Sequence, residues 1–183
     1  MRTLFPKELY VDIQQGLRYL PDETRRYSEL PQGFIDLLDE ASNRVSKIIE
    51  EEYGKHTEII PDLQLINESA SRFKSKSQNR DIHYHASDVY SFAVCDNLLV
   101  NPNTLVLRGS RAGRLRGENS RGLFRPGLSY ERVLKYKGTA NARSCTVKQR
   151  NRRRVTAIRS GEYHCAPPLP PGTRRAVFLS PEF

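Results

Sequence analysis

The sequence predicts an α+β domain in which helices come first and a sheet that forms a sandwich or a barrel follows. Two observations favour this order. The one clear helical pattern lies before residue 54, and the segments rich in β-branched and aromatic residues lie after it. At 183 residues, the chain is long enough for one domain with a substantial hydrophobic core.

Residues 34–53 carry the clearest helical pattern. Apolar residues recur there at the spacing of a single helix face, which predicts a helix that covers a sheet. They are Phe34, Leu38, Ala41, Val45 and Ile48. Gly54 predicts the end of this helix. Upstream, residues 6–20 predict a short helix, and residues 20–33 predict a loop.

The strands are predicted after this helix. Residues 57–69 form a short apolar stretch that is interrupted by Pro61, and residues 71–81 are polar and loop-like. One or two strands are predicted in 82–104, which end in an Asn-Pro-Asn turn, and another in 104–109. The last strands are predicted in 152–163 and 174–180.

The positive charge of the chain is concentrated in one segment. The formal net charge is +9, but residues 108–154 contain 15 Lys/Arg and two acids, so this segment alone is +13 and the remainder is −4. Local basicity of this kind indicates a solvated patch or phosphate contacts within that segment. It does not indicate that the whole domain is built for nucleic acid.

Composition excludes several other classes of protein. No apolar run approaches the roughly 18 residues that a membrane span needs, and the charged N-terminus does not resemble a signal peptide. Cys95, Cys145 and Cys165 are odd in number and widely spaced, so they predict neither a disulfide framework nor a zinc site. We therefore expect a reducing, cytoplasmic environment and no membrane span.

Histidines are the main candidates for chemistry. His56 lies in a charged loop and is expected to have no role. His83 and His85 are two residues apart on a predicted strand, so they face the same side, and His164 ends a later strand. Two histidines and one carboxylate form the facial triad that holds non-haem Fe(II) with positions left open for substrate and O₂. A nearby arginine would pair with the far end of a dicarboxylate cosubstrate.

Two segments resemble those of a known family. Residues 82–92, "IHYHASDVYSF", with the apolar run that follows, are similar to the His-x-Asp strand of the prolyl 4-hydroxylase-like Fe(II)- and 2-oxoglutarate-dependent dioxygenases. Residues 160–180, "SGEYHCAPPLPPGTRRAVFLS", resemble the family's distal segment. That segment has a Ser-Gly pair, the distal histidine, a proline hinge, a glycine and a basic residue ten positions after the histidine. The distal match is the more specific of the two.

The resemblance implies a fold and a set of metal ligands. The implied fold has N-terminal helices packed on a double-stranded β-helix (jelly-roll) core, which need not be complete. His85, Asp88 and His164 would hold Fe(II), and His83 is the alternative ligand if the strand register differs. Ser87 occupies the position of the family's His-x-Asp carboxylate. Asp88 therefore needs a β-bulge to reach the metal.

The resemblance also implies a cosubstrate and an activity. Arg174 would pair with the distal carboxylate of 2-oxoglutarate, and Arg175, which alternates to the other face of the strand, is expected at the surface. The implied activity is hydroxylation of a prolyl-type side chain in a protein or peptide, with ascorbate as the reductant. The dioxygenase-like domain would span 34–183, after an N-terminal extension at 1–33. It would contain the basic segment 108–154, in which the family's middle strand and turn are not recognisable.

Two functions from other classes stay open at this point. A chain that has lost its metal site through Ser87 would be a binding module on the same scaffold, without catalysis. Glycine and arginine interleave in residues 108–154, which would suit nonspecific contacts with the phosphates of nucleic acid. The His-x-His pattern at 83–85 also resembles that of single-strand nicking endonucleases.

Overall fold

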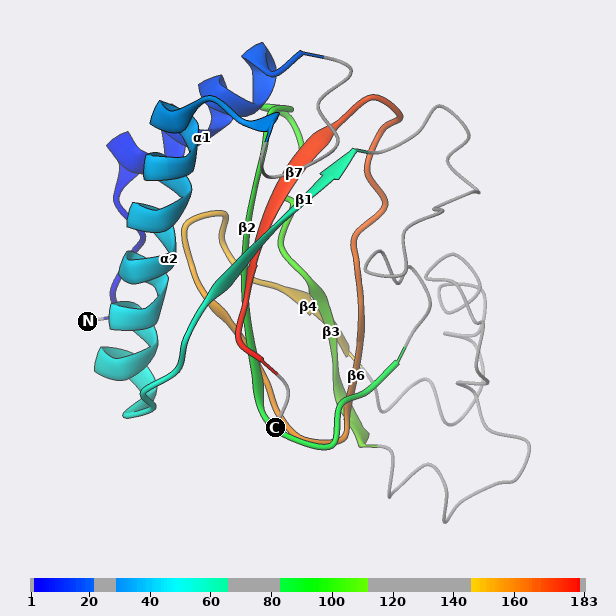
Figure 1. Cartoon of the computed structure of the whole chain (residues 1–183). Helices are drawn as coiled ribbons and strands as arrows, with labels where there is room; N and C mark the ends of the chain where they lie inside the picture. The colour runs from blue at the N-terminus through cyan, green and yellow to red at the C-terminus, as the bar shows by residue number, and fades with distance from the viewer. Residues whose placement is uncertain (1, 22–28, 66–82, 112–145, 182–183) are drawn as a thin grey trace.

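Two helices precede seven strands in the computed structural model, which describes residues 2–21, 29–65, 83–111 and 146–181 (Figure 1). The helices are α1 (Lys7–Tyr19) and α2 (Gln32–Tyr53). The strands are β1 (Ile60–Leu65), β2 (Val89–Cys95), β3 (Leu105–Arg111), β4 (Thr146–Gln149), β5 (Thr156–Ile158), β6 (Glu162–Cys165) and β7 (Arg174–Leu179). The predicted α+β class, with helices first, is confirmed.

Within the described residues, the strands form two antiparallel sheets that do not close into a barrel. The large sheet has the order β1-β7-β2-β5, and the small sheet has the order β4-β3-β6. Figure 1 shows α1 and α2 on one side of the large sheet, with the small sheet away from the helices. The two sheets meet through Val89 and Ile158 of the large sheet, which cluster with Val106 of the small one.

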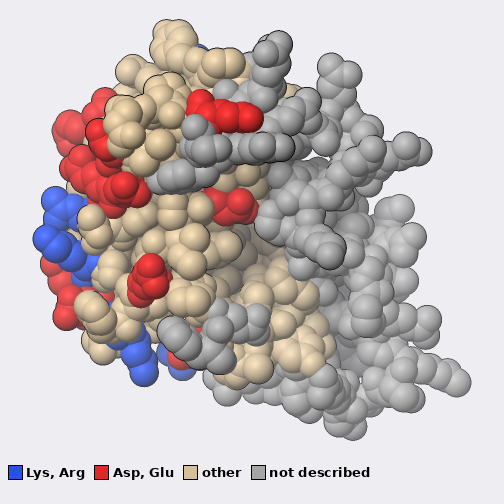
Figure 2. Space-filling model, viewed as in Figure 1, with Lys and Arg blue, Asp and Glu red and all other residues tan. Residues whose placement is uncertain are grey.

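The predicted helix at 34–53 is confirmed as α2, and all five residues of its predicted apolar face are buried. The short helix predicted at 6–20 is confirmed as α1, so the segment expected to be an N-terminal extension contributes to the main core. Figure 2 shows Asp and Glu side chains gathered on the helix side of the molecule. Neither described helix is long and apolar enough to cross a membrane.

Gly16 allows α1 and α2 to pack closely. A Cβ atom added at residue 16 would lie 2.4 Å from Cδ2 of Phe34, which is far inside van der Waals contact. Phe34 is buried at 5% exposure, so its ring has little freedom to move away. A glycine is therefore required on α1 where it crosses α2.

Gly54 ends α2 in the left-handed region, with φ of 64°, and its N–H donates to the carbonyl oxygen of Glu50. A side chain strains this conformation, so we expect Gly54→Ala to lower the free energy of unfolding by about 1 kcal/mol. Gly33→Ala is the matched control, because Gly33 lies within α2 with nothing within 4 Å of an added Cβ. There alanine should be neutral or stabilising. Urea unfolding checks both, and equal effects would contradict the prediction.

Most predicted strands are observed, with three differences in detail. Pro61 is accommodated in β1 because β1 is an edge strand, where the missing N–H need not pair. The segment 152–163 contains two strands, β5 and β6, and strand β4 lies at the end of the basic segment, where no strand was predicted. The predicted loop at 71–81 and most of the basic segment lie outside the described residues.

Asn103 ties the two sheets together through its amide. The side chain is 0% exposed, and its Oδ1 accepts the Ala93 N–H of β2 at 3.1 Å. Its Nδ2 donates to the carbonyl oxygen of Asn151, just after β4, at 2.9 Å. This fully bonded amide fixes the connection between β2 and β3, which carries the chain from the large sheet to the small one.

Candidate metal centre

The three histidines of the centre are brought together by one strand pairing. His83 and His164 exchange both backbone hydrogen bonds, at 3.0 and 2.9 Å, so the segment around His83 runs antiparallel to β6. The Gly161 N–H donates to the carbonyl oxygen of His85, which continues this pairing. Since His83 and His85 are two residues apart, both rings project to the face that carries the His164 ring.

The rings lie close enough to share one ion. The ring centroids are 4.2 Å apart for His83 and His164, 4.7 Å for His85 and His164, and 5.1 Å for His83 and His85. One nitrogen from each ring lies within 4.8 Å of the other two. Nitrogens on a tetrahedral ion with bonds near 2.05 Å are about 3.4 Å apart. Small side-chain rotations of the two half-buried rings, His83 and His85, would close this difference.

His164 is oriented as a metal-bound histidine usually is. Its Nδ1 lies 3.0 Å from the main-chain carbonyl oxygen of Glu162, so in the neutral ring Nδ1–H donates there and Nε2 keeps its lone pair for an ion. The side chain is 3% exposed. Burial, and after it the neighbouring His83, lower the pKa of His164 to about 3. The ring is therefore neutral at pH 7, which is the form that binds metal.

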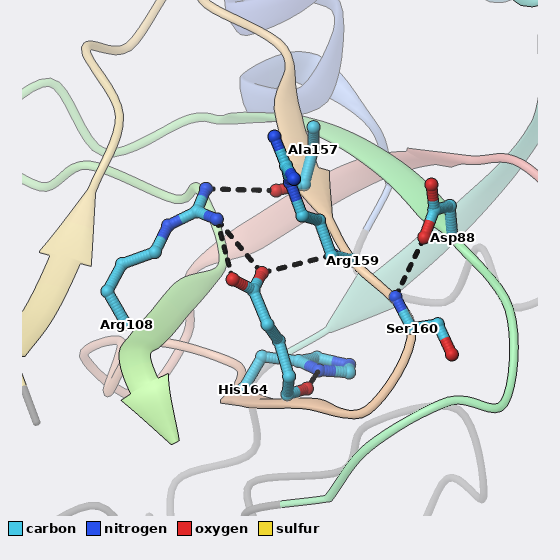
Figure 3. A network of polar contacts seen from close by, with 7 residues as sticks. Asp88, Arg108, Ala157, Arg159, Ser160 and His164 are labelled. Atoms are coloured by element: carbon cyan, nitrogen blue, oxygen red, sulfur yellow. Dashed lines mark hydrogen bonds and ion pairs between the residues drawn. The ribbon is translucent and has the colours of Figure 1, made fainter. Parts of the chain in front are cut away.

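A half-buried ion pair lies beside His164 (Figure 3). Nη1 of Arg108 on β3 donates to both carboxylate oxygens of Glu162, at 2.7 and 3.0 Å. Nη2 of Arg108 donates to the carbonyl oxygen of Ala157 on β5. This pair links β3, β5 and β6, and so fixes the strand whose carbonyl group orients His164.

Asp88, predicted as the carboxylate ligand, is not among the groups that converge on His164. Its Oδ1 accepts the Ser160 N–H at 2.8 Å, and Figure 3 shows the two residues apart from the His164 ring. Ser160 also donates its hydroxyl to the carbonyl oxygen of Ala86. Asp88 thus fixes the turn before β6. The third side chain that lies with His85 and His164 is His83.

The two arginines that open β7 lie on opposite faces of the strand. Ala176 and Phe178 face the helices, and Arg174 shares that face, where Nη1 donates to the carbonyl oxygens of Leu17 and Arg18 at 3.0 Å each. These carbonyls lie at the C-terminal end of α1, which attracts a cation. Arg174 therefore lies on the side of the sheet opposite the histidines, rather than where the resemblance implied.

Arg175 faces the small sheet, and the expectation that it lies at the surface is wrong. It is 4% exposed and donates to Oε1 of Gln64 at 3.2 Å and to the carbonyl oxygen of Pro102 at 2.6 Å. Its Nε has no partner among the described residues. Burial lowers the pKa of Arg175 to about 10. The guanidinium is still charged at pH 7, and it is the arginine of this pair that points between the sheets.

Comparison with protein-family models matched no family, and comparison with curated proteins found no match. Three imidazoles with an open coordination position can bind Zn²⁺, Fe²⁺, Ni²⁺ or Cu²⁺. They differ from the predicted set in lacking a ligand with negative charge.

His83 and Glu162 were not predicted as members of the site. His83 was held only as an alternative to His85, although its two-residue spacing already placed both rings on one side. The role of Glu162 comes from its main-chain carbonyl, which no side-chain pattern reports. Cys95 and Cys165 are both buried and are not joined to one another in a disulfide, and Cys145 lies outside the described residues.

The low pKa of His164 predicts that the metal-free protein loses stability in mild acid. Unfolding returns the His164 ring to its ordinary pKa of 6.5. Between pH 6.5 and pH 3, the unfolded chain therefore binds a proton at this ring that the folded chain does not bind. Stability is therefore full above pH 6.5 and falls as the pH drops toward 3. Between pH 7 and pH 5 this group should contribute a loss of about 2 kcal/mol.

Urea unfolding in EDTA at pH 7 and pH 5 measures this loss. Because other groups also titrate, the informative quantity is the difference between the native chain and His164→Asn, which should lack about 2 kcal/mol of the pH dependence. His56→Asn removes an exposed histidine and is the matched control. The same pH dependence in the native chain and in His164→Asn would contradict the prediction.

Proposed function

We propose that this protein binds one divalent transition-metal ion through His83, His85 and His164, and that it acts as an Fe(II)- and 2-oxoglutarate-dependent dioxygenase on a peptidyl, prolyl-type side chain. The observation that carries the proposal is the convergence of His85 and His164, which are 79 positions apart in the sequence. The activity itself rests on the resemblance of the segments that carry these histidines.

The strand order supports a jelly-roll core for this proposal. If the segment at His83 is counted as a strand, the large sheet holds the first, eighth, third and sixth strands. The small sheet then holds the second, seventh, fourth and fifth. This is the order of an eight-stranded jelly roll built from two Greek keys. The histidines would lie on its second and seventh strands and the arginine pair on its eighth.

Different residues of the chain would have different roles at such a centre. The carbonyl group of Glu162 holds His164 in the tautomer that offers Nε2, while Arg108 fixes Glu162. His83 and His85 are half-buried, which leaves one side of the centre open to a substrate. The ion, when bound, would supply the activation of O₂ that oxidises an unactivated C–H bond.

Arg175 is the better candidate for holding the distal carboxylate of 2-oxoglutarate. It faces the sheet that carries His164, it is charged, and its Nε lacks a partner among the described residues. Arg174 is already bonded to the end of α1. We therefore assign the binding of this carboxylate to Arg175, whereas the resemblance implied Arg174. Ascorbate would keep the metal reduced in the assay and needs no site of its own.

Succinate formation tests the dioxygenase proposal. The full chain is loaded anaerobically with Fe(II), and succinate from 2-oxoglutarate is measured after O₂ and ascorbate are added. We expect turnover in the native chain and in Arg174→Met, and at least about a 100-fold loss in Arg175→Met (about 3 kcal/mol). Circular dichroism shows whether each variant is folded, and Arg175→Lys should recover part of the activity.

The results separate the proposal from its alternatives. Stoichiometric iron uptake without succinate would reject the dioxygenase and keep the metal centre. No iron uptake would favour the non-catalytic binding module. Equal succinate formation in Arg174→Met and Arg175→Met would reject the part proposed for Arg175.

A further inference from the structure

A cavity lies over β5, apart from the three histidines of the candidate metal centre. Its volume is about 1100 Å³, and it is lined from both sides of this edge strand. Ala157 lies on the helix side, and Thr156 and Ile158 line it with residues of β3 and β4. None of the three histidines of the centre, all of which the structure describes, lines this cavity.

Basic residues from five separate segments line this cavity. They are Arg2, Lys55, Arg108, Lys148, Arg150 and Arg159. Arg108 is bonded to Glu162, whereas the side chains of the other five form no ion pair with the described residues. Such charges normally spread apart because they repel one another. Their gathering around one cavity favours an anionic occupant.

The acids of the cavity lining do not cancel this charge. They are Glu51, Glu52 and Asp88. Asp88 accepts the Ser160 N–H, and Oε2 of Glu51 accepts the hydroxyl of Thr3. The five cations therefore outnumber the three acids, and Oε1 of Glu52 is buried without a hydrogen-bond partner among the described residues.

A buried hydroxyl provides an independent indication of a ligand. Thr156 lines the cavity and is 1% exposed, and its Oγ1 has no hydrogen-bond partner among the described residues. Buried polar groups without a partner are rare in native proteins. A ligand oxygen at this position would accept the hydroxyl proton and satisfy the group.

We propose that this cavity binds a small anion that carries two or more adjacent phosphate groups. Guanidinium and ammonium groups are the side chains that bind phosphate oxygens, arginine in a fork and lysine as a point charge. Several cations around one volume match adjacent phosphates better than a single carboxylate. The volume also leaves room for an organic group beside Tyr53 and Tyr90, whose rings pack 5.1 Å apart at one side.

Isothermal titration with sodium tripolyphosphate tests this proposal. EDTA is present so that metal at the histidines does not contribute to binding. We expect one site per chain, and at least a tenfold weaker Kd in the double variant Lys148→Gln/Arg150→Gln. Thr156→Val, which keeps the shape of the side chain but removes the hydroxyl, should weaken binding a few-fold.

The matched control removes the same charges elsewhere. Arg44 and Lys47 lie on the exposed face of α2, outside the cavity, so Arg44→Gln/Lys47→Gln should bind as the native chain does. Equal weakening in the two double variants would indicate nonspecific attraction to net charge and would overturn the proposal. Absence of binding to the native chain would also overturn it.

A single-stranded oligothymidylate distinguishes the two sources of phosphate. At equal phosphate concentration, it should compete poorly with tripolyphosphate if the site takes a small ligand. Stronger binding of the oligonucleotide, lost in Lys148→Gln/Arg150→Gln, would assign the site to the backbone of a nucleic-acid strand and overturn the small-ligand proposal.

Discussion

Replacing His164 with alanine is expected to lower the affinity of the protein for a divalent metal ion by more than about 100-fold. Loss of a group that merely orients a ligand typically costs 10- to 100-fold in metal affinity, so loss of a ligand should cost more. His164 is also the central member of the cluster, since its ring lies nearer to each of the other two than they lie to one another. Without it, only two nitrogens would hold the ion.

Cobalt(II) is a suitable probe because its visible absorption reports coordination number. Titration of the native chain should produce the bands of a four- or five-coordinate ion at one equivalent, and His164→Ala should remove them. His164 is buried, so truncation could also disturb β6. His85→Ala avoids this difficulty because His85 is half-buried, and it should weaken binding to a similar degree.

The remaining histidine supplies the control. His56 is exposed and lies outside the cluster, so His56→Ala should bind cobalt(II) as the native chain does. Asp88→Asn discriminates between the two ligand sets. If Asp88 is a ligand, as the resemblance implies, the spectrum and the affinity should change. If the set is the three histidines, both should be nearly unchanged. Uptake of cobalt(II) that is equal in the native chain and in His164→Ala would exclude this centre.

Local periodicity was sufficient to predict the two helices and most of the strands. The apolar stripe of α2 and its terminal glycine depend only on neighbouring residues, and the sequence displays these directly. Strand pairing depends on partners far apart in the chain, which periodicity cannot supply. The pairing of His83 with His164 therefore could not be predicted, although the two-residue spacing of His83 and His85 correctly placed both rings on one side.

The arginines of β7 illustrate a second limit of sequence reasoning. Alternation places Arg174 and Arg175 on opposite faces of the strand, but it does not state which of them faces the sheet that carries His164. The resemblance implied one choice, and the structure has the other, because the end of α1 lies over Arg174. Similarly, the resemblance implied Asp88 as a metal ligand, whereas its carboxylate accepts a hydrogen bond from the backbone N–H of Ser160.

Phe92→Ala is expected to lower the free energy of unfolding by about 3–5 kcal/mol. Phe92 is 0% exposed at the centre of the large sheet's helix-facing core. Its ring centroid lies 4.5 Å from that of Phe5, 6.2 Å from that of Tyr10 and 6.1 Å from that of Phe178. Truncation would therefore remove contacts that join the N-terminal segment, α1 and β7, and would leave a cavity among them.

Urea unfolding in EDTA measures this effect apart from metal binding. Tyr19→Ala is the matched control, since it also truncates an aromatic ring but at 81% exposure, and it should change stability by less than about 0.5 kcal/mol. The comparison also tests whether residues before 34 belong to the folded domain. If they were a separate extension, Phe92 would lose two of its three ring partners, and Phe5→Ala would be nearly silent. A loss of several kcal/mol for Phe5→Ala as well would establish that the N-terminal segment stabilises the sheet that packs against the strands carrying the three histidines.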